Sequence, residues 1–215
     1  MLSSIPYCSI LYAKLNSNAC VMWIRRVFKA NGLDLIALLE AAIIQQDEPF
    51  VQSGVDAALL ATLMQYVSQP LLRACARAGA VKLESSAWDH GYCPLCAAWA
   101  ALAEVRGLEQ RRWLRCGRCA AQWRLALPRC YCCGNDDFST LGYLASESEH
   151  QARQASTCDV CGSYLKTFPT ISALTPAELL LKDLSSVELD MAALGQNYTR
   201  PDQPAFSLQV HVRPA

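Results

Sequence analysis

Four C-x-x-C motifs, here called knuckles, lie close together in the middle of this sequence. The first two, Cys93–Cys96 and Cys116–Cys119, are separated by nineteen residues, and the last two, Cys130–Cys133 and Cys158–Cys161, by twenty-four. A knuckle presents two thiolates on one tight turn, and a tetrahedral metal site needs two such turns brought together. Four knuckles at these spacings therefore predict metal binding by cysteine sulfur.

The ten residues between the second and third knuckles indicate which knuckles share a metal ion. In residues 120–129, Trp123, Leu125 and Leu127 alternate with other residues, which is typical of a strand. An extended segment at about 3.3 Å per residue would hold its ends roughly 25–35 Å apart, whereas sulfurs on one metal lie within about 4 Å. The predicted ligands are therefore two sequential sets: Cys93, Cys96, Cys116 and Cys119; and Cys130, Cys133, Cys158 and Cys161.

The four-thiolate ligand sets limit which metal ions and which reactions are expected at both sites. Four thiolates suit zinc or a single iron of the rubredoxin type equally well, so two metal ions of either kind are expected. Four protein ligands leave no position for water or substrate, which disfavours metal-assisted hydrolysis. We interpret Cys132 as a spare thiol and His90 and His150 as surface residues. The remaining cysteines are interpreted as buried apolar residues: Cys8, Cys20 and Cys75.

Composition favours a globular protein of a reducing compartment. The 215 residues are 53% hydrophobic with a formal net charge of zero, enough for one large or two small domains. Cysteines grouped in this way act as metal ligands only while they stay reduced, which predicts a reducing compartment. No apolar run reaches the roughly eighteen residues of a membrane span. Arg25 and Arg26 precede an apolar stretch, as in an export signal, but Asp34 and Glu40 within that stretch argue against export.

Helices are expected before the knuckles. Asp34 is placed as the N-cap of an amphipathic helix that follows it. A second helix is predicted from after Gly54 to about Val67, and Pro70 is expected to start a third over residues 71–80. The composition changes near Ser85, where aromatic residues and cysteines replace alanine and leucine.

A helix is also expected after the knuckles. Thr175 to Glu178 reads as a capping box with proline at the first helical position, and Gly195 as the stop. Five residues share one apolar face of this predicted helix: Leu180, Leu184, Val187, Met191 and Leu194. The tail after Pro201 is expected to be irregular.

The motifs also resemble those of a known family. GYCPLCAAW (91–99), RRWLRCGRCAAQW (111–123), PRCYCCG (128–134) and TCDVCGSYLK (157–166) are similar to the formate dehydrogenase accessory protein family FdhE, over about residues 85–200. Ala97 and Ala120 replace residues that are often small polar residues or glycine in that family. With ninety-two residues before Cys93, the N-terminal part is shorter than is usual there.

The resemblance implies an α+β fold with four parts. These are a helical N-terminal domain (1–84), two tandem rubredoxin-like or zinc-ribbon modules with four cysteines each (85–129 and 130–170), and a C-terminal helix and tail (171–215). It implies a cytoplasmic accessory protein, not an enzyme, that binds the catalytic subunit of a formate dehydrogenase, or of a related molybdenum or tungsten enzyme, during maturation. The eight knuckle cysteines carry over as metal ligands, and a homodimer is left open.

Two other functions are weighed against this one. Residues 106–129 carry seven arginines against one glutamate, which favours nucleic acid, but residues 136–160 carry a local charge of −4, which would repel phosphate. A nucleic-acid-binding zinc ribbon is therefore disfavoured. Rubredoxin-like electron transfer through iron is the other alternative, and it overlaps with the accessory role.

Overall fold

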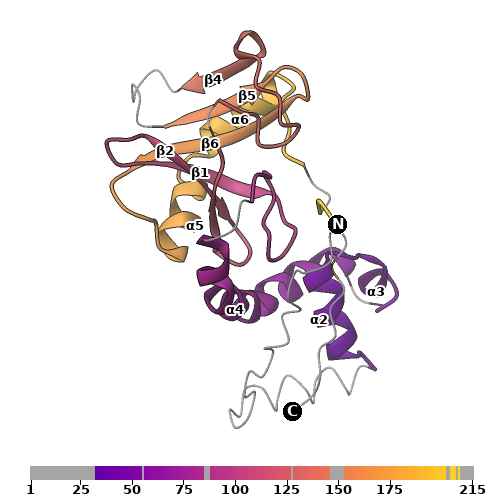
Figure 1. Cartoon of the computed structure of the whole chain (residues 1–215). Helices are drawn as coiled ribbons and strands as arrows, with labels where there is room; N and C mark the ends of the chain where they lie inside the picture. The colour runs from indigo at the N-terminus through magenta and orange to yellow at the C-terminus, as the bar shows by residue number, and fades with distance from the viewer. Residues whose placement is uncertain are drawn as a thin grey trace. The chain divides into compact units, whose positions relative to one another are not determined.

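The computed structural model describes residues 32–54, 56–84, 88–126, 128–145, 153–201, 204–206 and 208. The chain forms two compact units, Met1–Ala78 with Ser207–Ala215, and Gly79–Phe206 (Figure 1). The predictions made for Arg25, Arg26 and three other residues lie outside the described residues: Cys8, Cys20 and His150.

The first unit contains the helices predicted from its apolar periodicity. Helix α2 (Leu35–Ile44) begins where expected, because the Asp34 carboxylate accepts hydrogen bonds from the backbone N–H groups of Ile36 (2.9 Å) and Ala37 (3.2 Å). A short helix, α3 (Glu48–Val51), follows. The buried apolar core of this unit comes from α2, α3 and the start of α4: Leu38, Leu39, Ala41, Ala42, Phe50, Leu60 and Met64.

Helix α4 (Ala57–Glu84) runs without interruption through Pro70. The prediction of two helices separated at this proline was wrong. A proline inside a helix lacks one backbone donor and costs about 3 kcal/mol. The residues after it are strong helix formers, and Leu72 and Ala76 are buried, so continuing the helix offsets that cost.

The second unit is built on one six-stranded sheet. Its strands are β1 (Ala100–Arg106), β2 (Arg111–Cys116), β3 (Gln122–Arg124), β4 (Leu141–Ala145), β5 (Gln154–Cys158) and β6 (Ser163–Thr170). They lie in the order β3-β2-β1-β6-β5-β4 (Figure 1). All neighbours are antiparallel except β1 and β6, which are parallel, with Ala103 opposite Thr167 and Arg106 opposite Thr170.

The two cysteine-rich halves of the sheet repeat one order of elements. Each half runs from a knuckle through a hairpin to a second knuckle and a final strand. The parallel pairing of β1 with β6 joins the halves into one sheet. The mixed helix and sheet fold agrees with the predicted class, whereas the finer description as rubredoxin-like modules with the boundaries given above remains a prediction.

The strand predicted between the inner knuckles is shorter than expected. Only Gln122–Arg124 pairs with β2, although Trp123 and Leu125 are both buried as the alternation indicated. The backbone N–H of Leu125 still donates to the carbonyl of Arg112 at 3.4 Å, and Pro128 soon follows, which cannot donate to a sheet.

Two helices close the second unit where one was predicted. The capping box at the start of α5 (Pro176–Leu184) is present as predicted: the Glu178 N–H donates to Thr175 Oγ1 (3.3 Å), and the Thr175 N–H to Glu178 Oε2 (2.7 Å). The chain then breaks before α6 (Val187–Gly195). The buried Ser186 hydroxyl donates to the Lys182 carbonyl (2.7 Å), and such local bonds compete with continuation of a helix.

Both helices cover the same face of the sheet. Tyr164 and Phe168 are four residues apart in β6, so their side chains point to the same side of the sheet. Helix α6 packs Leu189 and Ala193 against Tyr164, and α5 packs Leu179 against Phe168. The predicted apolar face therefore lies on the outer side of this helical layer, exposed to solvent: Leu180, Leu184, Val187, Met191 and Leu194.

A buried lysine fastens the two helices to the sheet between these contacts. The ammonium group of Lys166 is fully buried and bonds to the carboxylates of Asp183 (2.6 Å) and Asp190 (2.8 Å). It also donates to the backbone carbonyl of Asp183 at 2.7 Å. Arg200 bonds to both carboxylates as well, so each is held by two cations.

Candidate metal centres

The four knuckles share one backbone turn. In each, the N–H of the residue after the second cysteine donates to the carbonyl of the first cysteine, at 2.9–3.1 Å. That residue has a positive φ in every case: Ala97 (59°), Ala120 (59°), Gly134 (76°) and Gly162 (65°). The left-handed residue closes the turn, so the two sulfurs of a knuckle face the same side.

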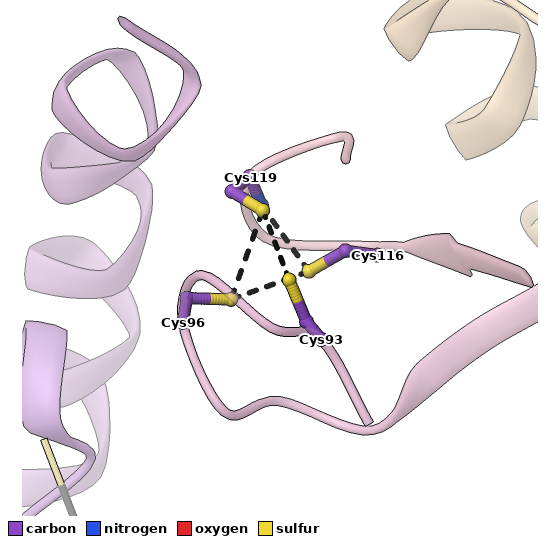
Figure 2. Close-up of side chains that lie close together, drawn as sticks. All are labelled: Cys93, Cys96, Cys116 and Cys119. Carbon is purple, nitrogen blue, oxygen red and sulfur yellow. Dashed lines mark hydrogen bonds between the residues drawn. The ribbon is translucent and has the colours of Figure 1, made fainter. Parts of the chain in front are cut away.

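The first site joins the first two knuckles, and Figure 2 shows their four sulfurs converging from two loops. The Sγ atoms of Cys93 and Cys119 are 3.5 Å apart, and Cys96 Sγ lies 3.4 Å from Cys116 and 3.8 Å from Cys119. A tetrahedral ion with metal–sulfur bonds of about 2.3 Å requires sulfur–sulfur distances of about 3.8 Å. All four sulfurs lie within 4.8 Å of one another, so this set fits a zinc or iron ion.

Burial and mutual contact perturb these thiols in opposite directions. Burial raises the pKa of Cys93 well above its ordinary value. Hydrogen bonds from Cys119 and Cys93 hold the pKa of Cys116 well below it. Four buried thiols this close cannot all ionise by themselves, whereas a divalent cation among them would balance four thiolates. The donor set thus has the chemistry of a cation site.

The second site joins the last two knuckles and is more open. Cys130 Sγ lies 3.7 Å from Cys161 Sγ, and Cys133 Sγ lies 3.8 Å from Cys158 Sγ. Cys130 and Cys158 are buried, but Cys133 and Cys161 are exposed.

Polar groups surround the sulfurs of this second site. The Ser163 hydroxyl lies 3.1 Å from Cys161 Sγ and 3.4 Å from Cys130 Sγ. Although burial acts to raise the pKa of Cys161, hydrogen bonds from Ser163 and neighbouring thiols lower it to about 7. Cys161 therefore ionises more readily than an ordinary cysteine.

The structure groups the eight predicted cysteines as their spacing indicated, and the inner knuckles do not share a site. Cys132 belongs to neither set and is half-buried. His90 is exposed, as predicted, and stacks on Tyr92 with ring centroids 5.0 Å apart. Cys75, in α4, is half-buried, less than predicted. Metal binding by the two sets stays a prediction.

Comparison with known proteins finds similarity to one family. Residues 129–206 match the family described as FdhE, C-terminal domain. An FdhE homolog of Aquifex aeolicus is 28% identical over 173 residues, covering 79% of this chain and 59% of the relative. Protein FdhE of Escherichia coli O127:H6 is 29% identical over 111 residues, covering 51% of this chain and 35% of the relative. This chain is therefore similar to proteins of the FdhE family.

The matches cover different shares of this chain and of the similar proteins. The chain spans 59% and 35% of the lengths of these two FdhE relatives. The crystal structure of FdhE from Pseudomonas aeruginosa is 19% identical and covers 85% of this chain and 78% of its own, with a TM-score of 0.49. The segment matching the FdhE C-terminal domain contains the second cysteine set, β4–β6, α5 and α6. The first set precedes it.

Sequence reasoning missed the contacts that connect the surroundings of the two sites. The indole N–H of Trp123 donates to the carbonyl of His90 (2.8 Å), next to the first knuckle. Arg112 donates to the carbonyl of Arg129 (2.8 Å), next to the third, and Arg129 pairs with Asp89. These bonds connect residues before the first knuckle, residues between the second and third, and strand β2.

It also missed a buried ionic cluster on β1 and β2. Glu104 is fully buried and pairs with Arg115 and with Arg106 (2.6 Å). Arg115 donates in turn to the carbonyl of Leu174 (2.7 Å), just before the capping box. A glutamate between the apolar residues Ala103 and Val105 was the available signal. Arg112 and Arg115 are buried, so the arginine-rich segment is not a continuous basic surface.

Among the described residues, no helix is both long and apolar enough to span a membrane.

Proposed function

We propose that this protein is an accessory factor that binds the catalytic subunit of a formate dehydrogenase, or of a related molybdenum or tungsten enzyme, during its maturation in the cytoplasm. The observation that carries the proposal is the presence of two complete four-thiol sets in a chain whose residues 129–206 match the FdhE C-terminal domain. We infer the client protein from the resemblance to the FdhE family, and the mode of action from the geometry of the two cysteine sets.

The two sets would hold one metal ion each, iron of the rubredoxin type or zinc. A bound ion would link the two knuckles of each set directly. It would also balance the charge of four thiolates. The eight cysteines would be its ligands in the pairings given above. The shared sheet and the hydrogen bonds to the carbonyls of His90 and Arg129 would keep the knuckles in place.

The geometry favours binding over catalysis. Four thiolates per ion leave no coordination position for a substrate or water. The ligands come from turns at the ends of one rigid sheet, which suits a fixed docking surface. Burial of Arg112 and Arg115 removes part of the charge on which a nucleic-acid-binding role depended.

We assign the docking of the catalytic subunit to the outer side of α5 and α6. Six apolar side chains are exposed there on two consecutive helices: Leu180, Leu181, Leu184, Val187, Met191 and Leu194. Folding does not require them, because the opposite sides of both helices already contact the sheet. A group of exposed apolar residues of this kind is typical of a protein-binding surface.

Co-purification with a tagged catalytic subunit tests both parts of the proposal. The double variant Cys93→Ser/Cys96→Ser should lose one metal ion per chain by elemental analysis and recover less of the subunit. The double variant Leu184→Glu/Met191→Glu should keep both ions and also recover less. Leu108→Glu, at a fully exposed apolar residue in the β1–β2 turn, is the matched control. Unchanged recovery of the subunit with both double variants would refute the proposal.

A further inference from the structure

The two cysteine sets differ in their access to solvent. All four sulfur-bearing residues of the first set are buried. In the second set, the second cysteine of each knuckle, Cys133 and Cys161, is exposed, and the first of each, Cys130 and Cys158, is buried. The two sets thus have the same ligand type and similar spacing, but they differ in the exposure of their cysteines to solvent.

From this difference we propose that the second site exchanges its metal ion with external chelating ligands through Cys133 and Cys161, while the first site retains its ion. The inference rests on the metal binding proposed above. It divides the two sites into one that stabilises the fold and one whose ion can be loaded, withdrawn or passed on.

Access determines the rate of such an exchange. An incoming ligand must reach the ion or a sulfur before a metal–sulfur bond breaks. At the second site it can approach on the side of Cys133 and Cys161, which the protein does not cover. At the first site it can approach only after local opening, because Cys93, Cys96 and Cys116 are completely buried.

The chemistry of the exchange is ligand substitution without a redox step. Each bond from the ion to a cysteine sulfur that breaks is replaced by one bond from the ion to the chelator. The departing thiolate takes a proton from water or remains ionised, and the oxidation state of the ion does not change. No oxidant or reductant is needed.

Groups around the second site would ease the departure of its exposed ligands. The Ser163 hydroxyl lies 3.1 Å from Cys161 Sγ, where it can donate to the freed thiolate. Cys132, the spare thiol, donates its backbone N–H to Cys130 Sγ at 3.4 Å. Asn135 Nδ2 lies 3.7 Å from Cys158 Sγ, and so holds one of the two buried ligands that would release the ion last.

The test uses the full chain, loaded anaerobically with zinc, and a chromogenic zinc chelator in excess. We expect two phases of one zinc per chain each, with the slow phase at least about tenfold slower because it requires local opening. Cys133→Ser should abolish the fast phase and leave the slow one. Cys75→Ser, a cysteine outside both sets, should change neither.

A second measurement needs no variant. After the fast phase, alkylation with iodoacetamide followed by peptide mapping should modify Cys133 and Cys161 and leave the first set protected. Release of both ions in one phase, or alkylation of the first set before the second, would overturn the exchange proposal alone. A protein that holds no zinc after loading would overturn metal binding as well, and elemental analysis separates the two failures.

Discussion

The Cα of Gly91 lies against the backbone carbonyl of Tyr131. A Cβ added to Gly91 would come within 1.6 Å of that oxygen and 2.5 Å of the carbonyl carbon. Gly91 stands just before the first knuckle and Tyr131 lies inside the third, so the backbones of the two cysteine-rich halves approach each other closely here. The ring of Tyr131 is buried beside Trp99, with centroids 6.0 Å apart.

Gly91→Ala should therefore destabilise the protein strongly. The atoms in the way are backbone atoms of a knuckle, which cannot move without displacing its sulfurs, so we expect a loss of about 2–3 kcal/mol in the free energy of unfolding. Denaturant unfolding of the metal-loaded protein measures it. Gly195→Ala, where an added Cβ meets nothing within 4 Å, is the control and should stay within about 0.5 kcal/mol of the parent.

The left-handed residues of the knuckles allow a test with opposite signs. Ala120 has φ of 59° and is only half-buried, so Ala120→Gly should remove strain and stabilise by about 0.5–1 kcal/mol. Gly162 has φ of 65° and room for a Cβ, with the nearest atom at 3.8 Å, so Gly162→Ala should destabilise by about 1 kcal/mol. Thermal unfolding of the metal-loaded variants measures both changes in stability. Changes in the unfolding temperature that have the same sign in both variants would contradict this account.

Ala97 is a special case among these turns. Its φ is also 59°, but its methyl group is completely buried. Burial of one such group is worth about 0.8 kcal/mol, which nearly cancels the strain that glycine would relieve. Ala97→Gly should consequently change the free energy of unfolding much less than Ala120→Gly.

Replacement of Lys166 should loosen the helical layer. Lys166→Met keeps the apolar stem but removes one of the two cations that pair with Asp183 and Asp190, and we expect a loss of about 3 kcal/mol in the free energy of unfolding. Hydrogen exchange should rise in α5 and α6 before it rises in α4. Lys182→Met, on the same helical layer but only half-buried, is the matched control and should have a small effect. Equal effects of the two variants would contradict a fastening role for Lys166.

The same cluster predicts a dependence of stability on acid. Burial acts to raise the pKa of Asp190, but hydrogen bonding to Lys166 and the charge of Arg200 lower it below its ordinary value. A carboxyl with a lowered folded pKa contributes stability above its unfolded pKa of about 4, and loses it as the pH falls through the folded value. Asp190→Asn should therefore unfold with a shallower pH dependence below about pH 4.

The measurement is the denaturant midpoint of parent and variant at a series of pH values. Acid also protonates the cysteines and releases metal from both, so the comparison is between the two slopes. Tyr164, which donates to Asp190 at 2.9 Å, and Asp183 also face this carboxyl, and both are unchanged in the variant. Identical slopes would show that Asp190 carries no linked proton.

The cysteine pairing could be predicted from sequence because it depends on short-range geometry. Two knuckles separated by nineteen or twenty-four residues have room for a hairpin, whereas the inner pair does not meet. The N-cap at Asp34 and the capping box at Thr175 were predicted for the same reason, since a cap is decided within three residues. Local signals of this kind do not need tertiary information.

The features that were missed depend on contacts between residues distant in the sequence. Pro70 predicts a helix start by itself, and only burial of Leu72 and Ala76 favours continuing the helix. The burial of Arg115 depends on Glu104 in the neighbouring strand and on the Leu174 carbonyl fifty-nine residues later. The apolar residues of α5 and α6 could not be divided into inner and outer sets before the position of the sheet was known.

The parallel pairing of β1 with β6 determines how this protein can be divided. The segment that matches the FdhE C-terminal domain begins at residue 129 and contains β6 without β1. A fragment cut there would keep four of the eight cysteines, but the backbone N–H and C=O groups along one side of β6 would lose their partners. A free strand edge of this kind invites pairing with other chains, so the isolated fragment should self-associate more than the whole chain does.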